Sequence, residues 1–126
     1  MKKVFLIATA LFLGVAAMAQ TKVEDVTKFT AETHDFGKIK HNVPVTYFFE
    51  FKNTSDKPLV VENASASCGC TVPERPEKPI MPGQVGKLKV VFNAAAVGPI
   101  HKDVYVKFAG VEQTKTLKIT GEVLGD

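Results

Sequence analysis

Apolar and polar side chains alternate along four segments of the chain. The clearest segment covers residues 45–51, where one face is wholly apolar. Successive side chains of a β-strand point to opposite faces, so a period of two predicts a strand with one face toward a core. Residues 87–92, 103–108 and 116–123 repeat the pattern. The apolar rows are Val45, Tyr47, Phe49, Phe51; Leu88, Val90, Phe92; Val104, Val106, Phe108; and Leu117, Ile119, Val123.

Shorter apolar runs and turn-forming clusters separate these strands. We expect weaker strands near residues 29–33, 59–62, 68–72 and 97–100. The clusters between them are rich in Gly, Pro, Asn, Asp and Ser, which favour turns through their special φ values or their bonds to nearby backbone. No segment after residue 19 has the 3.6-residue period of a helix. The pattern predicts an all-β fold, an immunoglobulin-like antiparallel β-sandwich of about seven strands.

The N-terminus has the three parts of a secretory signal peptide. Lys2 and Lys3 supply positive charge, residues 4–15 are almost entirely apolar, and an A-x-A site ends at Ala19. The apolar run is shorter than the roughly 20 residues that span a membrane, so we expect cleavage after Ala19 rather than a retained anchor. The expected domains are a signal peptide at 1–19, a flexible leader at 20–28 and a sandwich at 29–126. We expect export to the periplasm, with release from the cell as the alternative.

The net charge of the chain and its lack of known motifs give no support to several classes of function. The chain has 16 basic and 13 acidic residues, and Lys2 and Lys3 lie in the signal peptide. The rest is nearly neutral, which gives no electrostatic basis for binding nucleic acid or an anionic membrane. The sequence contains no G-x-x-x-x-G-K phosphate loop, no G-x-G-x-x-G and no G-x-S-x-G nucleophile elbow.

We therefore expect an exported, non-enzymatic binding or structural module without a cofactor. Its expected partner is another protein, and no membrane span remains after cleavage of the signal peptide. The expected contact surfaces are residues 73–83 and exposed strand edges, because a sheet edge can accept another chain.

The two cysteines of the chain, Cys68 and Cys70, are one residue apart. In a regular strand their Cα atoms would be roughly 6.7 Å apart, at the upper limit for a disulfide. We expect Gly69 to adopt positive φ and fold the segment into a turn that brings the sulfurs together. Pro82 and Gly83 are also expected to form a turn.

Three roles stay open for this cysteine pair. In the first, residues 68–70 shape a corner at the end of a sandwich strand as a reduced or oxidised structural turn, and a disulfide there would close a loop of about three residues and stabilise the fold by only about 1.6 kcal/mol. An accessible, labile disulfide could instead exchange with thiols, although no helix is predicted to activate it as in C-x-x-C enzymes. Two thiolates could also bind a soft metal such as Cu(I). The further ligands for a metal would come from His34, His41 and His101, together with several carboxylates.

Several landmarks in a fixed order carry a family resemblance. They are His34-Asp35-Phe36-Gly37-Lys38-Ile39, residues 49–54, Ser67-Cys68-Gly69-Cys70-Thr71, residues 79–83, the strand at 87–93, Gly98 and residues 117–123. With them, the chain after the signal peptide resembles exported bacterial immunoglobulin-like domains of unknown function, common in Bacteroidetes-type proteomes. That family is similar to Hydin-like and major-sperm-protein-like β-sandwiches, which are largely scaffold or protein-contact modules. The resemblance implies the fold and leaves the function open.

Overall fold

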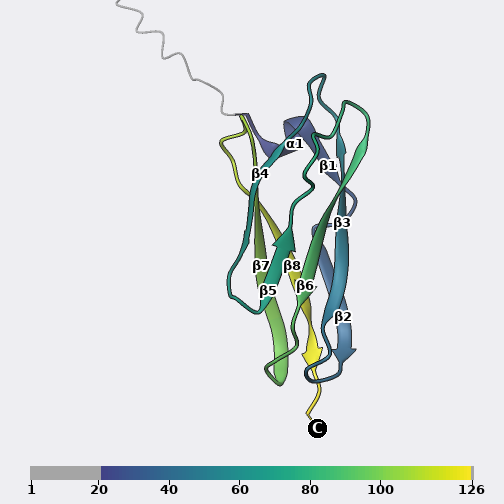
Figure 1. Ribbon diagram of the computed structural model, residues 1–126, viewed down its shortest axis with the longest axis vertical. Coiled ribbons are helices and arrows are strands. Elements are labelled where there is room, and N and C mark those ends of the chain that lie inside the picture. The colour runs from purple at the N-terminus through teal and green to yellow at the C-terminus, as the bar shows by residue number, and fades with distance from the viewer. Residues whose placement is uncertain (1–20, 126) are drawn as a thin grey trace, which may run out of the picture.

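The computed structural model describes residues 21–125, which form one short helix and eight strands (Figure 1). The predicted signal peptide and its cleavage site lie outside the described residues. The elements are α1 (Val23–Val26), β1 (Thr27–Phe29), β2 (Thr33–Ile39), β3 (Val45–Asn53), β4 (Val61–Ala66), β5 (Thr71–Glu74), β6 (Val85–Phe92), β7 (Gly98–Phe108) and β8 (Lys115–Val123). Within this part of the chain, no helix is long and apolar enough to cross a membrane.

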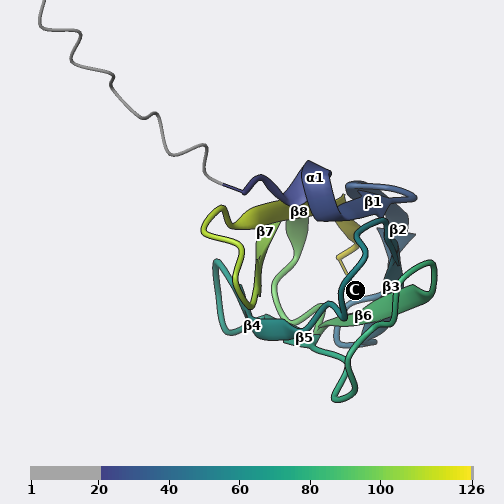
Figure 2. The ribbon, with the colours of Figure 1, turned by 90° about the horizontal axis from the view of Figure 1, so that it is seen from above.

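The strands form two sheets that face each other, as the view along the sandwich shows (Figure 2). Sheet A has the order β1-β3-β6-β5, and sheet B has the order β2-β8-β7-β4. This arrangement confirms the predicted all-β, immunoglobulin-like sandwich. Two details differ from the prediction, since there are eight strands rather than about seven and β2 pairs with β8 in parallel.

Both details arise because the first strand is split between the sheets. β1 pairs antiparallel with β3 in sheet A, and residues 30–32 then carry the chain across to the edge of sheet B. There β2 runs beside β8, the last strand. This crossing places β1 at an edge of sheet A and β2 at an edge of sheet B. Hairpin connections predict only antiparallel pairs, so they do not predict the parallel pair of β2 and β8.

The core lies between the two sheets and consists of the predicted apolar rows. Phe49 and Phe51 of sheet A and Phe108 of sheet B are fully buried, and the rings of Phe51 and Phe108 meet edge to face at 5.4 Å. The alternating rows of β6, β7 and β8 are buried as predicted. Each buried large side chain stabilises the fold by roughly 1.5–3 kcal/mol, so these rows supply most of the driving force.

The segment predicted as a flexible leader is folded from Val23 onward. Val23 is only 1% exposed, its backbone N–H donates to Oε1 of Gln113 at 2.9 Å, and Val26 packs on the core. Thr27 donates from its hydroxyl to the Val23 carbonyl at 2.8 Å. Val23 and Val26 therefore anchor α1. The sequence pattern does not predict this, because Gln113 lies far from Val23 in the sequence.

The His34 to Ile39 landmark forms a β-bulge in β2. The register with β8 shifts between Asp35 and Lys38, Gly37 has a φ of 67°, and its N–H donates to Oδ1 of Asp35 at 2.8 Å. The backbone of Gly121 in β8 passes so closely that an added Cβ would lie 2.7 Å from the Gly37 carbonyl oxygen. Asp35, Gly37 and Gly121 thus shape the backbone where β2 joins sheet B.

Candidate functional site

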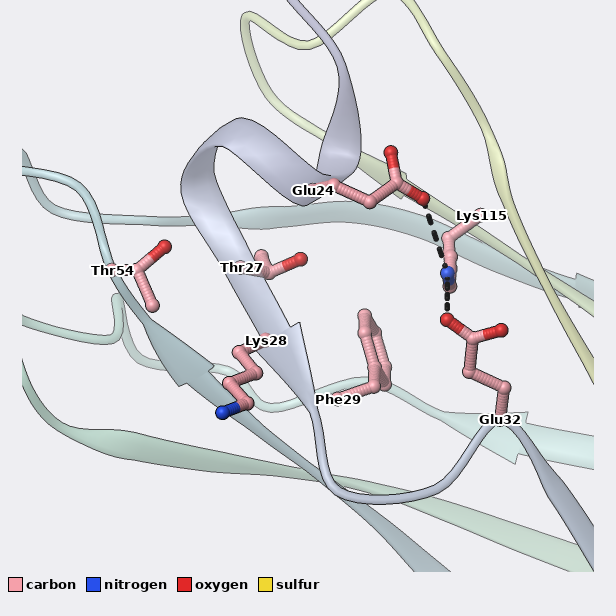
Figure 3. Close-up of a pocket in the computed structure, with 7 residues that line it drawn as sticks. All are labelled: Glu24, Thr27, Lys28, Phe29, Glu32, Thr54 and Lys115. Atoms are coloured by element: carbon pink, nitrogen blue, oxygen red, sulfur yellow. Dashed lines mark hydrogen bonds and ion pairs between the residues drawn. The ribbon is translucent and has the colours of Figure 1, made fainter.

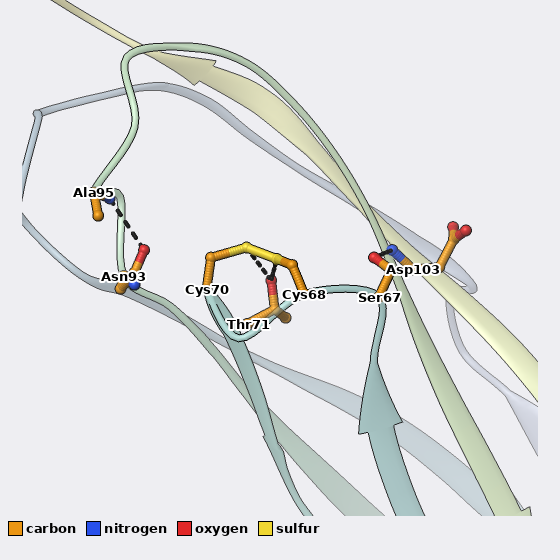
Figure 4. Close-up of a disulfide and its surroundings, with 7 residues drawn as sticks. All are labelled: Ser67, Cys68, Cys70, Thr71, Asn93, Ala95 and Asp103. Carbon is orange, nitrogen blue, oxygen red and sulfur yellow. Dashed lines mark hydrogen bonds between the residues drawn. A yellow bond between two sulfur atoms is a disulfide. The ribbon is translucent and has the colours of Figure 1, made fainter.

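Cys68 and Cys70 are joined in a disulfide at the corner where the chain passes from β4 in sheet B to β5 in sheet A (Figure 4). Their Cα atoms are 5.3 Å apart, within the usual range for a disulfide. The Thr71 N–H donates to the Cys68 carbonyl at 3.4 Å and closes a tight turn. The prediction that Gly69 needs positive φ was wrong, because the turn itself shortens the distance with φ outside the left-handed region.

Backbone hydrogen bonds hold this disulfide turn on both sides. The Ser67 N–H donates to the Asp103 carbonyl at 3.0 Å, and the Asp103 N–H donates to Oγ of Ser67 at 3.1 Å. On the other side, the Asn93 N–H donates to the Cys70 carbonyl at 2.9 Å. The turn is therefore fixed to β7 and to the end of β6 by contacts that do not involve sulfur.

The two sulfurs share one hydroxyl but lie in different surroundings. Both cysteines are half-buried, and Cys70 packs against the edge of the core. Thr71 is 3% exposed, and its Oγ1 is 3.6 Å from Sγ of Cys70 and 3.9 Å from Sγ of Cys68. Disulfide sulfurs carry no hydrogen, so the Thr71 hydroxyl is the donor in these weak hydrogen bonds.

The structure does not bring the three histidines together with the cysteine pair. His34 is in β2 and stacks on Tyr47 at a centroid distance of 3.6 Å, and His41 contacts the Ala95 carbonyl at 3.1 Å through Nε2. His101 is exposed on β7. Among residues 21–125, no three or more His, Cys, Asp or Glu side chains gather in a group that could hold a metal ion.

Asn53 at the end of β3 is a buried polar residue whose role was not predicted. Its side chain is 0% exposed and donates from Nδ2 to the carbonyls of Lys57 at 2.7 Å and Ile80 at 2.8 Å. Its Oδ1 accepts from the Ser55 N–H at 2.9 Å and the Ser55 hydroxyl at 2.7 Å. The signal was in the sequence, since the period of two that buries Phe49 and Phe51 also points Asn53 inward.

The backbone of Asn53 anchors the turn that contains Pro82 and Gly83. The Gly83 N–H donates to the Asn53 carbonyl at 2.8 Å, and the Asn53 N–H donates to the backbone carbonyl of Gln84 at 2.9 Å. Gly83 has a φ of 80° in this turn. Within residues 73–83, Ile80 is buried and pairs with Leu59, whereas Met81 is 47% exposed. This segment is thus partly a structural anchor and partly a surface.

The loops around the disulfide form one continuous end of the sandwich, which we call the loop end. It consists of the turn at residues 40–44, the disulfide turn at 67–70 and the loop at 93–97. The Asn42 N–H donates to the Ala94 carbonyl at 2.8 Å, and both residues have left-handed φ, 63° and 55°. In the described part of the chain they are the two non-glycine residues with positive φ.

Exposed apolar side chains lie on and beside the loop end. Val43 is 50% exposed, Val97 is 55% exposed and Leu124, just after β8, is 39% exposed. On the adjoining outer face of sheet A, Val72 is 51% exposed and Phe48 is 48% exposed. Five of the eight large apolar residues that are exposed in residues 21–125 are therefore at this end or next to it.

A pocket at the opposite end holds an ion-pair cluster (Figure 3). The Lys115 ammonium pairs with Glu32 and, at 3.3 Å, with Glu24, and it lies 5.5 Å from the Phe29 ring centroid. Burial alone would lower the pKa of Lys115, but its hydrogen bonds to Glu32 and Glu24 outweigh this and raise the pKa. The cluster ties α1 and the β1–β2 link to β8, which is a structural role.

The fold and the loop end described above define an immunoglobulin-like β-sandwich module. Over residues 27–123 the chain matches the family described as a protein of unknown function (DUF1573), and it belongs to that family. No curated protein matches the chain.

Solved structures with low sequence identity share the fold. A protein of unknown function from Porphyromonas gingivalis W83 has a TM-score of 0.67 and 15% identity, over 78% of this chain and 46% of that one. The human CEP192 PapD-like domain 7 has a TM-score of 0.62 and 9% identity, over 80% and 87%. The Vibrio cholerae VesB protease has a TM-score of 0.61 and 12% identity, over 79% and 32%. The chain thus spans less than half of the Porphyromonas and Vibrio chains.

Proposed function

We propose that the protein is an exported, non-enzymatic module that binds another protein through its loop end. The gathering of exposed Val43 and Val97 on hydrogen-bonded loops is the observation that carries this proposal. Exposed apolar groups that adjoin one another favour contact with a partner, because covering them removes apolar surface from water. Loops on a rigid sandwich are also the usual position for binding residues.

The backbone of the loop end supports a preorganised contact surface. A non-glycine residue at left-handed φ costs of order 1 kcal/mol and persists only where its surroundings hold it. Ala94 is 0% exposed, and its carbonyl accepts the hydrogen bond from Asn42, so the two loops fix each other. These loops are already ordered in the folded protein, so binding of a partner here does not require the loss of loop entropy.

Export is part of the proposal, with removal of residues 1–19 and a mature chain that begins at Gln20. A disulfide between Cys68 and Cys70 is compatible with an oxidising compartment. Intact mass of the protein recovered from the periplasm tests this part. A mass that includes residues 1–19 would contradict it.

The binding surface is tested with a photo-crosslinking amino acid at single positions in the exported protein. Val97 and Val85 are both 55% exposed, but Val97 belongs to the loop end and Val85 begins β6 far from it. We expect a discrete cross-linked protein band from position 97 and from position 43, and none of that size from position 85. Equal bands from positions 97 and 85, or no band from 97 and 43, would overturn the proposal.

A further inference from the structure

Beyond the binding role, we propose that the Cys68–Cys70 disulfide exchanges once, in a stoichiometric and non-catalytic step, with a partner protein that carries a pair of cysteine thiols. The fold does not need this bond. The bond closes a very small loop, and the chain-entropy stabilisation from a disulfide is smallest for the smallest loops. The turn is already held by hydrogen bonds from Ser67, Asp103 and Asn93. The sulfur bond can open while the backbone around it keeps its place.

The two sulfurs are unequal, which assigns them different parts in the exchange. Cys70 packs against the edge of the core and has the shorter contact with the Thr71 hydroxyl, 3.6 Å against 3.9 Å for Cys68. Cys70 packs against the core and Cys68 does not, so the Cys68 sulfur is the one open to an incoming group, and a thiolate that forms on Cys70 would accept a hydrogen bond from the Thr71 hydroxyl. Cys68 is therefore the sulfur that an incoming thiolate attacks.

The exchange proceeds in two displacements. A thiolate of the partner attacks Sγ of Cys68, the Cys68–Cys70 bond breaks, and its electron pair leaves on Cys70, which gives a mixed disulfide between Cys68 and the partner. The partner's second thiolate then attacks the partner sulfur of that mixed disulfide and releases Cys68 as a thiolate. Two electrons pass from the partner's dithiol to the cysteine pair, and the two thiol protons of the partner end on Cys68 and Cys70.

The surface beside the disulfide is suited to a polypeptide substrate. Val72 is two residues after Cys70, points outward from β5 and is 51% exposed. Val91 of β6 is its partner in the sheet, and Phe48 of β3 lies on the same outer face. A chain that flanks the attacking cysteine could cover this apolar strip while its thiol reaches Cys68.

The first experiment uses the full exported protein and reduced glutathione as the probe. The protein is incubated with excess glutathione, quenched with an alkylating agent and read by intact mass and peptide mapping. We expect a glutathione adduct on Cys68 and then a fully reduced protein, and reoxidation by glutathione disulfide. A disulfide that stays intact in excess reduced glutathione, or an adduct mainly on Cys70, would overturn the proposal.

The second experiment tests the assignment of the two sulfurs with matched variants in cells. In Cys70→Ser, the Cys68 thiolate can attack the disulfide of the oxidised partner, which is the reverse of the second displacement, and the second partner sulfur leaves as a thiolate. No Cys70 thiol is present to release Cys68, so this variant should accumulate a mixed disulfide with the partner protein, visible as a band that dithiothreitol removes. Cys68→Ser should accumulate several-fold less. Equal accumulation, or none in either variant, would contradict the assignment.

The third experiment tests Thr71 as the residue that stabilises the departing thiolate. Thr71→Val should slow reduction of the disulfide by glutathione about fivefold, the factor given by one hydrogen bond of ordinary strength. Thr71→Ser keeps a hydroxyl and should restore the rate. Circular dichroism controls for folding, and a Thr71→Ser rate as slow as that of Thr71→Val would overturn this role.

Discussion

Asn53 and the Cys68–Cys70 disulfide each fix a chain reversal, but they do so at different depths. Asn53 is fully buried, and its amide makes four hydrogen bonds that bind two loops to the end of β3. The disulfide is half-buried and closes a turn that other hydrogen bonds already hold. The buried hydrogen bonds of Asn53 therefore hold the structure, whereas the backbone around the disulfide is held without the sulfur bond.

The largest expected loss of stability comes from a substitution of Asn53. Asn53→Ala removes a fully buried amide and its four hydrogen bonds, and we expect it to lower the free energy of unfolding by about 3–4 kcal/mol. Denaturant unfolding followed by circular dichroism measures this. Asn63→Ala is the matched control on exposed β4, and it should cost less than about 0.5 kcal/mol. A small loss at Asn53 would remove the basis of the comparison.

Gly121 tests a second buried landmark, the close approach of β8 to the bulge in β2. Gly121→Ala would place a Cβ 2.7 Å from the Gly37 carbonyl oxygen at a φ of 144°. We expect a loss of about 2 kcal/mol and faster hydrogen exchange in β2. Gly125→Ala, whose Cβ would meet only a Val97 methyl group at 3.9 Å, is the control and should be nearly neutral. Equal stability of the two variants would contradict the account.

Gly69 provides the opposite case on the disulfide side. It has no left-handed φ, and an added Cβ would meet nothing within 4 Å. We therefore expect Gly69→Ala to change stability by less than about 0.5 kcal/mol and to keep the disulfide. Intact mass with and without alkylation, together with a denaturant titration, checks both points. A variant with free thiols would show that the turn does require glycine.

His34 gives a test of stability that depends on pH, because its stacked ring is only partly buried. Burial lowers the pKa of His34 from its usual value of 6.5, and the charge of Asp35 opposes the shift. Between the folded and unfolded pKa values the unfolded chain binds more protons, so stability is lost as pH falls below about 6.5 toward the folded value. His34→Tyr keeps a ring without this titration and should flatten the slope of stability against pH. His101→Gln, which leaves the stack intact, should not flatten it.

The sequence predicted those parts of the fold that depend on local alternation. The strand rows were confirmed because one face of each strand meets the core. Two features escaped because their cause is distant in sequence: α1 is held by Gln113 and Lys115, and the bulge of β2 lies against Gly121 of β8. The inward position of Asn53 could be predicted from the alternation, but its partner Ile80 could not. The cysteine pair was found from its spacing, but the asymmetry created by Thr71 required the structure.

If the disulfide is dispensable for folding, its removal should cost little stability. Guanidinium unfolding of the protein is compared with that of the Cys68→Ala/Cys70→Ala double variant, under conditions that keep the wild-type disulfide oxidised. We expect a loss of no more than about 1.6 kcal/mol, with one cooperative transition and an unchanged denaturant slope. A loss as large as that expected for Asn53→Ala, or a variant that does not fold, would show that the disulfide is a structural staple.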